Sequence, residues 1–372
     1  MGVQPSPRLP PASRRGLLLS VPLLALPHVP RRAKAATPAP ILDQPMQRLR
    51  LPQGTVGRDY VLLQLKLGGK GPFDFVVDTG LTAEMITPHL RQVLGIPPSR
   101  QRLETGFGAG GSVLGAELVE LKDATLAGAD GLPLPPLTAV VTDFIQEHMD
   151  PAHDPVEGML GQELLSLFDL DLDFRAGRLR LYRPGDGVAA AAAAGLVEVP
   201  AAVLNETGVL GIRATSPAAA QRGGQPFVGI LDCGASFSAL NWKAAVLAGL
   251  PPKGDAAYNT RERGVAIVGV DGKPQVLPTT SVQFSFAGAP HRAEGGGGLR
   301  FDPPPAGWRP WDPVTAAVGE LPVFSLMLGD GSRPYEGPAA LLGLDVLSQR
   351  RVVISAGAGR SGRARQLWVS AT

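Results

Sequence analysis

The chain has a single cysteine, Cys233, and one thiol cannot close a disulfide within the chain. Burial alone must therefore hold the fold together, and disulfides give no indication of the compartment. Net charge is also small, at +2. Residues 1–35 carry six basic residues and no acid, so removing them leaves −4 for the rest of the chain. A mildly acidic body lacks the basic surface that nucleic acids require, and we expect no nucleic-acid partner.

Long hydrophobic runs are absent as well. The best candidate, Gly16–Leu26, is interrupted by Pro22 and is shorter than the about 20 residues that span a bilayer. Arg14-Arg15 precede this run and the small-residue stretch Ala33-Lys34-Ala35 follows it, as in a removable targeting segment. We therefore predict a targeting segment at residues 1–35 and no integral membrane segment after its removal.

The destination of this segment has two interpretations. The twin arginines favour bacterial export, which leads to the periplasm or to secretion. The absence of acids, with Arg, Pro and some Ser, equally fits an organellar transit sequence that ends in the plastid (thylakoid) lumen. The sequence leaves this choice open, and it also leaves open whether residues 36–55 are a propeptide.

Glycine and proline are abundant, with 47 and 37 residues in a chain of 372. Together they exceed a fifth of the chain, which favours short strands joined by turns over long helices. Hydrophobic residues at 44% provide enough material for a core, and the length allows two domains of ordinary size.

An internal duplication organises the chain. Phe73-Asp74-Phe75-Val76-Val77-Asp78-Thr79-Gly80 parallels Phe227-Val228-Gly229-Ile230-Leu231-Asp232-Cys233-Gly234, with each Phe five residues before the last Asp. Downstream, Met159-Leu160-Gly161 and Leu341-Leu342-Gly343 are each followed by an acid two residues later and a Leu four residues later. Because both blocks recur in the same order, we interpret the halves as homologous lobes.

The pattern within each half predicts a mostly β fold with two β-barrel-like lobes and a cleft between them. We expect an N-terminal lobe at 36–186, an Ala-rich linker at 187–195 and a C-terminal lobe at 196–372. Residues 288–320, which are rich in Gly and Pro, are expected to be a long loop. Strands are expected at 60–67, 73–77, 113–121, 168–174, 281–286 and 351–354, and short helices at 88–94, at 241–248 and after Gly161 and Gly343.

Asp78 and Asp232 are the candidate catalytic residues. Two carboxylates that lie close together cannot both ionise, so the pair shares one proton. The ionised member can then take a proton from water while the protonated member donates to a scissile carbonyl. A Gly two residues after each Asp, Gly80 and Gly234, lets two tight turns approach each other closely.

These blocks resemble the Asp-Thr-Gly signature of the pepsin and retropepsin clan of aspartic peptidases, and the Gly234-Ala235-Ser236 ending is closer to the retropepsin-like branch. The resemblance implies an aspartic-type endopeptidase that hydrolyses extended protein segments without a cofactor. It also implies that Gly161 and Gly343 pack beside the catalytic loops, and that the Thr79 hydroxyl ties those loops together. Protein or peptide substrates and a monomeric chain are expected.

The chain departs from this signature at two positions. Cys233 replaces the usual Thr or Ser, and a thiol is a poor donor for the bond between the loops. Leu81 is bulky where the clan has a small residue. Phe107, in a Gly-rich stretch, is a candidate for the flap that covers the substrate. A catalytically silent, peptide-binding relative is therefore the alternative to a peptidase.

Two further signals point to structure rather than chemistry. We interpret Cys233 as a structural thiol, because a neighbouring aspartate disfavours its thiolate. The alternating Asp169, Asp171 and Asp173 are expected to form a solvated strand face rather than a calcium site. No metal site is predicted.

Overall fold

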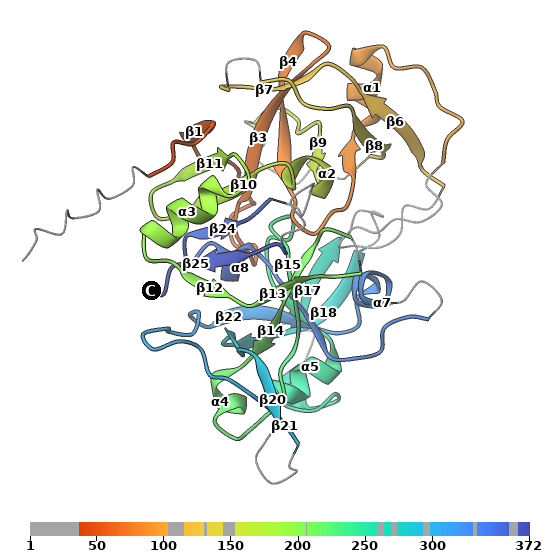
Figure 1. The fold of residues 1–372 in the computed structure, drawn as a ribbon. Coiled ribbons are helices and arrows are strands. Elements are labelled where there is room, and N and C mark those ends of the chain that lie inside the picture. Colours follow the sequence, from red (N-terminus) through yellow and green to blue (C-terminus); the bar gives the residue numbers. More distant parts are fainter. Residues whose placement is uncertain are drawn as a thin grey trace, which may run out of the picture. The chain divides into compact units, whose positions relative to one another are not determined.

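The computed structural model describes residues 37–102, 115–129, 132–143, 153–205, 207–258, 264–268, 274–292, 298–329, 333–356 and 364–372. Thr37–Thr372 form one compact unit, and the predicted targeting segment lies outside the described residues. The unit is mostly β, as the sequence predicts, and Figure 1 shows its strands and short helices. Within the described ranges, no helix is long and apolar enough to cross a membrane.

The first half of the chain forms one sheet around the strand that leads into Asp78. Its order is β2-β3-β4-β9-β5-β8-β6, and β7 pairs with β3. Strand β4 lies parallel to β9, so that Val77 is beside Leu160. The strands are β2 (Gln47–Leu49), β3 (Tyr60–Leu67), β4 (Lys70–Val77), β5 (Glu84–Ile86), β6 (Glu117–Leu121), β7 (Ala124–Leu126), β8 (Leu137–Val141) and β9 (Gly158–Leu160).

The second half repeats this topology. Its sheet runs β13-β14-β15-β23-β16-β22-β18-β17, and β19 pairs with β14. Strand β15 lies parallel to β23, which places Leu231 beside Leu342, as Val77 is beside Leu160. The strands are β13 (Ala201–Val203), β14 (Leu210–Thr215), β15 (Phe227–Leu231), β16 (Ala239–Leu240), β17 (Gly264–Val268), β18 (Pro274–Val282), β19 (Ser285–Phe286), β22 (Val314–Val318) and β23 (Ala339–Leu342).

A third sheet, β1-β11-β10-β24-β25-β12, joins the halves. The antiparallel pair β10–β24 crosses between them, with Asp171 opposite Val353. Because each half supplies three adjacent strands, the backbone ladder itself links the two halves. The strands are β1 (Leu42–Pro45), β10 (Asp169–Asp173), β11 (Arg178–Tyr182), β12 (Val197–Val199), β24 (Val352–Ile354) and β25 (Leu367–Val369).

The helices are short and most begin at a recognisable cap. The Thr87 hydroxyl accepts the Leu90 N–H at the start of α1, and the Asn241 side chain accepts the Ala244 N–H at the start of α5. The helices expected after Gly161 and Gly343 are present as α2 and α8. The helices are α1 (Pro88–Leu94), α2 (Gln162–Leu165), α3 (Asp186–Ala193), α4 (Pro217–Ala220), α5 (Trp242–Leu247), η1 (Ala256–Tyr258), α7 (Pro322–Leu328) and α8 (Leu344–Leu347).

The Ala-rich segment expected as a linker at 187–195 is largely helical. Helix α3 packs on β10 and β24, and Figure 1 shows it beside the sheet that joins the halves. A Cβ on Gly187 would lie 2.5 Å from the Cβ of Asp169, so the absence of a side chain permits this close packing. Alanine combines high helix propensity with a small side chain, and burial of Ala190 and Ala191 stabilises the helix here.

Two other expectations are also wrong: a segment expected to be a loop contains strands, and aspartates expected in solvent are buried. Residues 288–320 are not one loop: they contain the hairpin β20 (Pro290–Arg292) and β21 (Leu299–Phe301) as well as β22. Asp169 and Asp171 are fully buried rather than solvated. Asp169 accepts three backbone N–H groups, and Asp171 accepts both Arg351 and Arg180.

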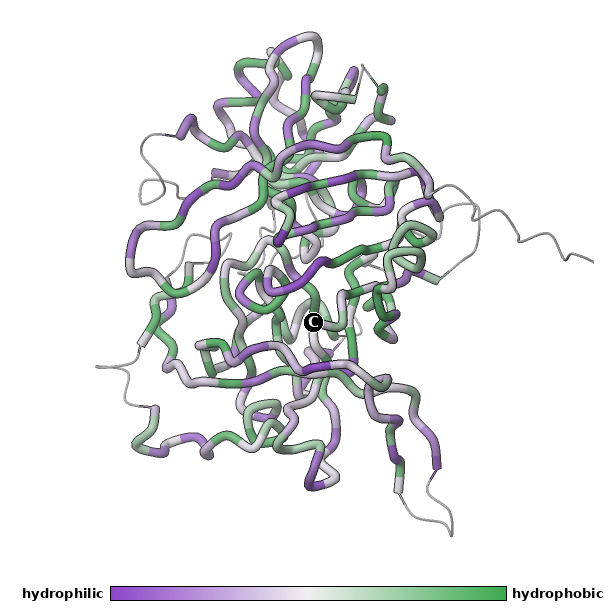
Figure 2. Tube along the Cα trace, turned by 90° about the vertical axis from the view of Figure 1, so that its left-hand side faces the viewer, coloured by the Kyte–Doolittle hydropathy of each residue, from purple (hydrophilic) through white to green (hydrophobic). Residues whose placement is uncertain are grey.

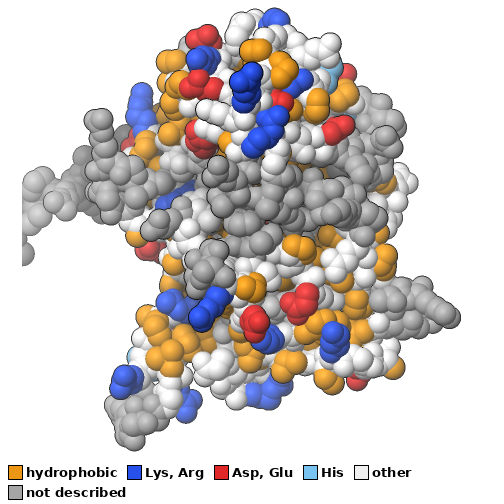
Figure 3. Space-filling view, turned by 90° about the vertical axis from the view of Figure 1, so that its right-hand side faces the viewer, with side chains coloured by type: hydrophobic (Ala, Val, Ile, Leu, Met, Phe, Trp, Pro, Cys, Tyr) orange, Lys and Arg blue, Asp and Glu red, His pale blue; other side chains and the backbone are white. Residues whose placement is uncertain are grey.

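The largest hydrophobic cluster draws leucines from both halves and from the joining sheet. Figure 2 shows hydrophobic and hydrophilic residues alternating along many strands, as expected for strands with one buried face. On the face drawn in Figure 3, acidic and basic side chains are interspersed. The packing of this core positions the two loops that follow β4 and β15.

Candidate active site

Asp78 and Asp232 come together at the carboxyl ends of β4 and β15. The N–H of Asp78 donates to Leu160 O at 3.0 Å, and the N–H of Asp232 donates to Leu342 O at 3.1 Å. A Cβ on Gly80 would lie 2.6 Å from the carboxyl carbon of Asp232, and one on Gly234 would lie 2.2 Å from that of Asp78. Each glycine therefore contacts the opposite carboxylate, and no side chain fits between the two loops.

Burial dominates the electrostatics of the pair. Asp78 is 4% exposed and Asp232 is 0% exposed. Desolvation raises both pKa values, and the nearby charge of Asp232 raises the pKa of Asp78 well above its usual range. One oxygen of each carboxylate accepts the N–H two residues later, from Gly80 or Gly234, at 2.8 Å. The other oxygen of Asp232 has no hydrogen-bond partner among the described residues. A pair in this environment holds a proton at pH values where an exposed aspartate is ionised.

Thr79 ties the two loops together. Its hydroxyl donates to Leu231 O at 3.0 Å and accepts the Cys233 N–H at 2.9 Å. Through these two hydrogen bonds the Thr79 hydroxyl connects the Asp-Thr-Gly turn to the backbone on both sides of Asp232. The resemblance implies a loop-tying role for Thr79, and this role stays a prediction.

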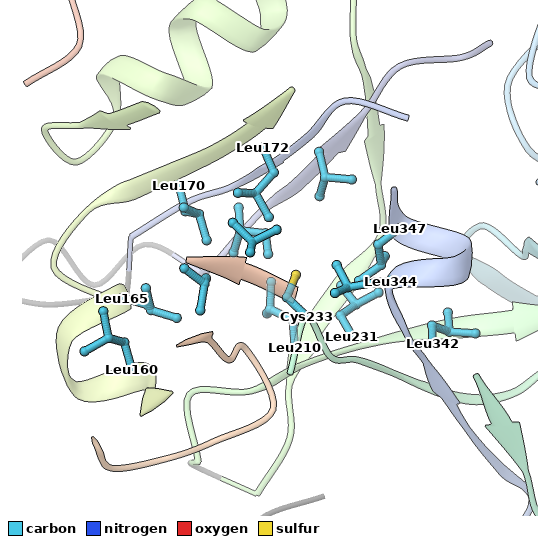
Figure 4. Packing of buried hydrophobic residues seen from close by; sticks show 14 of the residues in the cluster. Leu160, Leu165, Leu170, Leu172, Leu210, Leu231, Cys233, Leu342, Leu344 and Leu347 are labelled. Atoms are coloured by element: carbon cyan, nitrogen blue, oxygen red, sulfur yellow. The ribbon is translucent and has the colours of Figure 1, made fainter. Parts of the chain in front are cut away.

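The Cys233 side chain faces the core rather than a substrate. Figure 4 shows its sulfur among leucine side chains from both halves, including Leu172 and Leu344. Burial raises the pKa of the thiol to about 12, so it stays protonated in neutral solution. A buried, protonated thiol is not a nucleophile, in agreement with the structural role expected from the sequence.

Gly161 and Gly343 lie against the loops that carry Asp78 and Asp232. A Cβ on Gly161 would lie 2.6 Å from Ala83 O, and one on Gly343 would lie 2.7 Å from Phe237 O. Both contacted residues stand five positions after the corresponding Asp. The structure therefore brings together all the predicted site residues that it describes. Phe107, the flap candidate, lies outside the described residues.

Residues 63–164, which contain the first Asp and Gly161, match the model of a protein family described as aspartyl protease. The first half of this chain is related to the aspartyl proteases. The family match ends before the second half, but the duplicated blocks and repeated sheet topology give that half the same arrangement. No curated protein matches the chain. Solved structures that match include a crystal structure of a retropepsin-like aspartic protease from Rickettsia conorii. That match has 16% identity and a TM-score of 0.26, and it covers 38% of this chain and 93% of that chain.

A buried acid supports the loop that follows each aspartate, and neither acid was among the candidate site residues. Glu84, six residues after Asp78, accepts the Leu164 N–H at 2.9 Å. In the second half the equivalent residue is Ser238, and the acid is Asp345, which accepts the Ser238 N–H and hydroxyl at 3.0 and 2.6 Å. The first half has an acid at the position of Asp345 as well, Glu163, but that side chain accepts from Thr138 instead. The two halves therefore support their loops from different positions, which the matching acids in the sequence do not indicate.

Burial changes the protonation of Glu84. It is 0% exposed, and desolvation raises its pKa to about 8. One carboxyl oxygen has no hydrogen-bond partner among the described residues, in agreement with a protonated group in an apolar site. Glu84 is therefore a further buried carboxyl group, close in sequence to one member of the pair Asp78 and Asp232 (the dyad).

Tyr60, at the start of β3, also lies near the dyad. Its hydroxyl is hydrogen-bonded to Ser236. Burial is the largest cause that raises its pKa, and the charges of Asp232 and Asp78 add to it. The sequence showed Tyr60 only as the first residue of an expected strand, so it carried no signal for this position.

Leu81 is accommodated without disturbing the site. It is 5% exposed and packs in a small cluster with Met85 and Val140. Its carbonyl accepts the Gln162 N–H at 2.8 Å, as the carbonyl of Ala235 accepts the Leu344 N–H at 2.8 Å. The bulky residue therefore leaves the backbone of the loop in the same arrangement as in the other half.

A separate cavity of about 600 Å³ lies in the first half, between the end of α1, the turn from β3 to β4 and strand β6. Its lining includes Lys70, Arg100, Lys122 and apolar residues such as Leu94. None of the predicted site residues lines it, so it is distinct from the dyad.

Proposed function

We propose that this protein is an aspartic-type endopeptidase that cleaves extended segments of protein substrates with a water activated between Asp78 and Asp232. The observation that carries the proposal is the mutual contact of the two loops, in which Gly80 and Gly234 each face the opposite carboxylate. This contact requires two carboxylates to share a small, desolvated space. The relationship of residues 63–164 to the aspartyl proteases supports the same chemistry.

Because the pair shares one proton, one carboxyl group can act as a base and the other as a hydrogen-bond donor. The ionised carboxylate takes a proton from water as the water oxygen attacks the scissile carbonyl carbon, while the protonated carboxyl donates to the carbonyl oxygen. The tetrahedral intermediate then collapses as the leaving nitrogen gains a proton and the C–N bond breaks. Neither aspartate is given a fixed role, because the titration belongs to the pair. The reaction requires no cofactor.

An extended substrate fits the position of the dyad. Both carboxyl groups lie at strand ends and are almost inaccessible to solvent. A peptide bond inside a folded domain cannot present its carbonyl to such a buried pair, whereas an extended segment exposes every carbonyl. We therefore expect unfolded proteins or flexible loops to be cleaved and compact domains to resist.

The test is cleavage of a library of peptides from denatured proteins by residues 36–372, from pH 4 to 8. We expect a bell-shaped pH dependence for the native chain and loss of at least about 1,000-fold in turnover for Asp78→Asn and Asp232→Asn. Both variants keep the size of the side chain, and circular dichroism confirms that each is folded. Cleavage that persists in both variants would contradict the proposal.

The Thr79 hydroxyl bonds to the opposite loop, and position 233 has no hydroxyl that could make the equivalent bond. This asymmetry favours one alternative, a peptide-binding relative that has lost turnover. In that case the library would show binding without cleavage, and Asp78→Asn would bind as tightly as the native chain. Isothermal titration with peptides retained by the native chain separates the two outcomes.

A further inference from the structure

Arg365, from the second half, is a buried arginine that reaches the first half. It is 5% exposed and lies shortly before β25. Its Nε donates to Ser355 O at 3.0 Å, and its Nη1 donates to Gly208 O and to the Oε1 of Gln162. Gln162 is 203 positions away in the sequence, so this contact joins the two halves beside the dyad.

Gln162 continues the chain of bonds to the catalytic loop. It is 4% exposed and directly follows Gly161. Its Nε2 donates to Thr79 O at 2.6 Å, and its backbone N–H donates to Leu81 O at 2.8 Å. An arginine can only donate and a carbonyl can only accept, so the two partners fix the orientation of the amide group. Gln162 is thus held at both ends.

This connection exists in one half only. The residue after Gly343 is Leu344, which is fully buried and has no polar group that could reach the carbonyl of Cys233. The loop that receives the connection is the Thr79 loop, whose hydroxyl makes the two bonds across the dyad. Gln162 therefore holds the backbone of the residue whose hydroxyl bonds to the opposite loop.

We propose that Arg365 and Gln162 are positioning residues that fix the Thr79 loop and so keep Asp78 and Asp232 facing each other. The catalytic part of this inference rests on the proposed peptidase function. The chain of contacts runs from the second half, through Gln162, to the backbone of Thr79.

Arg365 acts through Gln162 rather than through its charge. The carboxylate whose charge acts on Arg365 is Asp169, and desolvation lowers the pKa of the guanidinium to about 10. Tyr60 from β3 and Cys233 from the adjoining turn interact electrostatically with both aspartates. Neither residue is replaced in the Gln162 variant, so a change in the titration of the dyad reports on the geometry of the loop.

The test compares Gln162→Leu, which introduces the residue found at the matching place in the other half, with Arg365→Met and with the double variant. Kinetics on a cleaved peptide give kcat and KM. Proteins labelled with ¹³C at aspartate carboxyl carbons give the titration of the dyad by NMR, with signals assigned from Asp78→Asn and Asp232→Asn. We expect kcat to fall about 10- to 100-fold with KM within about twofold, because the loops lose alignment rather than substrate contacts.

The titration gives a readout that a purely structural role would not move. When the carboxylates separate, their mutual repulsion weakens, and the higher of the two apparent pKa values of the dyad should fall toward that of an ordinary aspartate. The double variant should behave like each single variant, because the same connection is cut once. The double variant also removes the buried guanidinium, so no charge is left without its Gln162 partner. It can therefore be measured even if Gln162→Leu alone fails to fold.

Val346→Ala, a core truncation in the matching helix α8, is the control. It should lower the melting temperature and leave the dyad titration unchanged. An unchanged titration in folded Gln162→Leu would overturn the inference. Absence of cleavage by the native chain would instead contradict the proposed function, and the NMR titration would still decide whether Gln162 holds the dyad.

Discussion

At the scale of single residues, Cys233 is the position where a hydrogen bond between the two loops is expected to be missing. The Thr79 hydroxyl donates to the carbonyl before Asp232, but a thiol is too weak a donor to make the reciprocal bond to Val77 O. Cys233→Ser supplies a hydroxyl of nearly the same size. We expect it to raise the free energy of unfolding by about 1 kcal/mol, measured by urea denaturation, and to raise kcat.

Cys233→Ala is the matched control, because it removes the sulfur and adds no donor. It should not raise kcat. If only the serine variant cleaves peptides, the native chain is the silent relative, and if serine and alanine behave alike, the thiol does not limit the site.

Gly234 permits the approach of the two loops. A Cβ at this position would lie 2.2 Å from the carboxyl carbon of Asp78, so Gly234→Ala must push the loops apart. We expect a loss of roughly 100-fold or more in kcat, measured on the library peptides, because the shared proton needs both carboxyl groups close together. The matched control is Gly298→Ala, where a Cβ meets nothing within 4 Å, and its kcat should equal that of the native chain. Full activity in Gly234→Ala would contradict the geometry.

At the scale of elements, the sequence predicted those whose signals are local. The helix at 88–94 and the strand at 60–67 have the predicted boundaries, because a Thr-Pro cap and a run of alternating apolar residues decide them. Helix α3 was missed because its stability comes from packing on β10. The local sequence does not indicate this contact between distant segments. The dyad was predictable from the duplicated motif. Tyr60, Gln162 and Arg365 were not, since their roles depend on contacts between distant segments.

Glu84 links strand β5 to the start of α2, and this link should make stability depend on pH. Its pKa is about 8 in the folded chain, against 4.5 for an ordinary glutamate. Between these values the folded state holds a proton that the unfolded state has lost, so the contribution of Glu84 to stability falls as pH rises from about 4.5 to 8. Glu84→Gln keeps the acceptor for Leu164 and cannot ionise.

We therefore expect the variant to gain stability relative to the native chain as pH rises from 5 to 8, by at most about 4 kcal/mol. Urea midpoints across this range measure the difference. Glu120→Gln, at an exposed position, is the control and should show almost no trend. A constant difference between Glu84→Gln and the native chain would show that Glu84 is ionised when folded.

At the scale of the whole molecule, the two halves must hold one alignment, because each supplies one aspartate. The backbone pairing of β10 with β24 provides part of this alignment. At the same crossing, Arg351 donates to both oxygens of the buried Asp171, at 2.9 and 2.7 Å. A buried carboxylate with two donors in a fixed geometry fixes the register between the halves as well as stabilising them.

Asp171→Asn should therefore destabilise the whole unit, since it leaves the Arg351 guanidinium facing an amide in place of a carboxylate. We expect a loss of roughly 3 kcal/mol in the free energy of unfolding by urea, at the lower end for a buried pair because Arg351 is partly exposed. Asp43→Asn makes the same change in an ion pair that is 39% exposed at the carboxylate, and should cost less than about 1 kcal/mol. The double variant Asp171→Leu with Arg351→Met removes both charges and should recover much of the loss. If its stability recovers and its kcat does not, the ion pair sets the alignment of the two aspartates; if both recover, packing of the joining sheet is sufficient to align them.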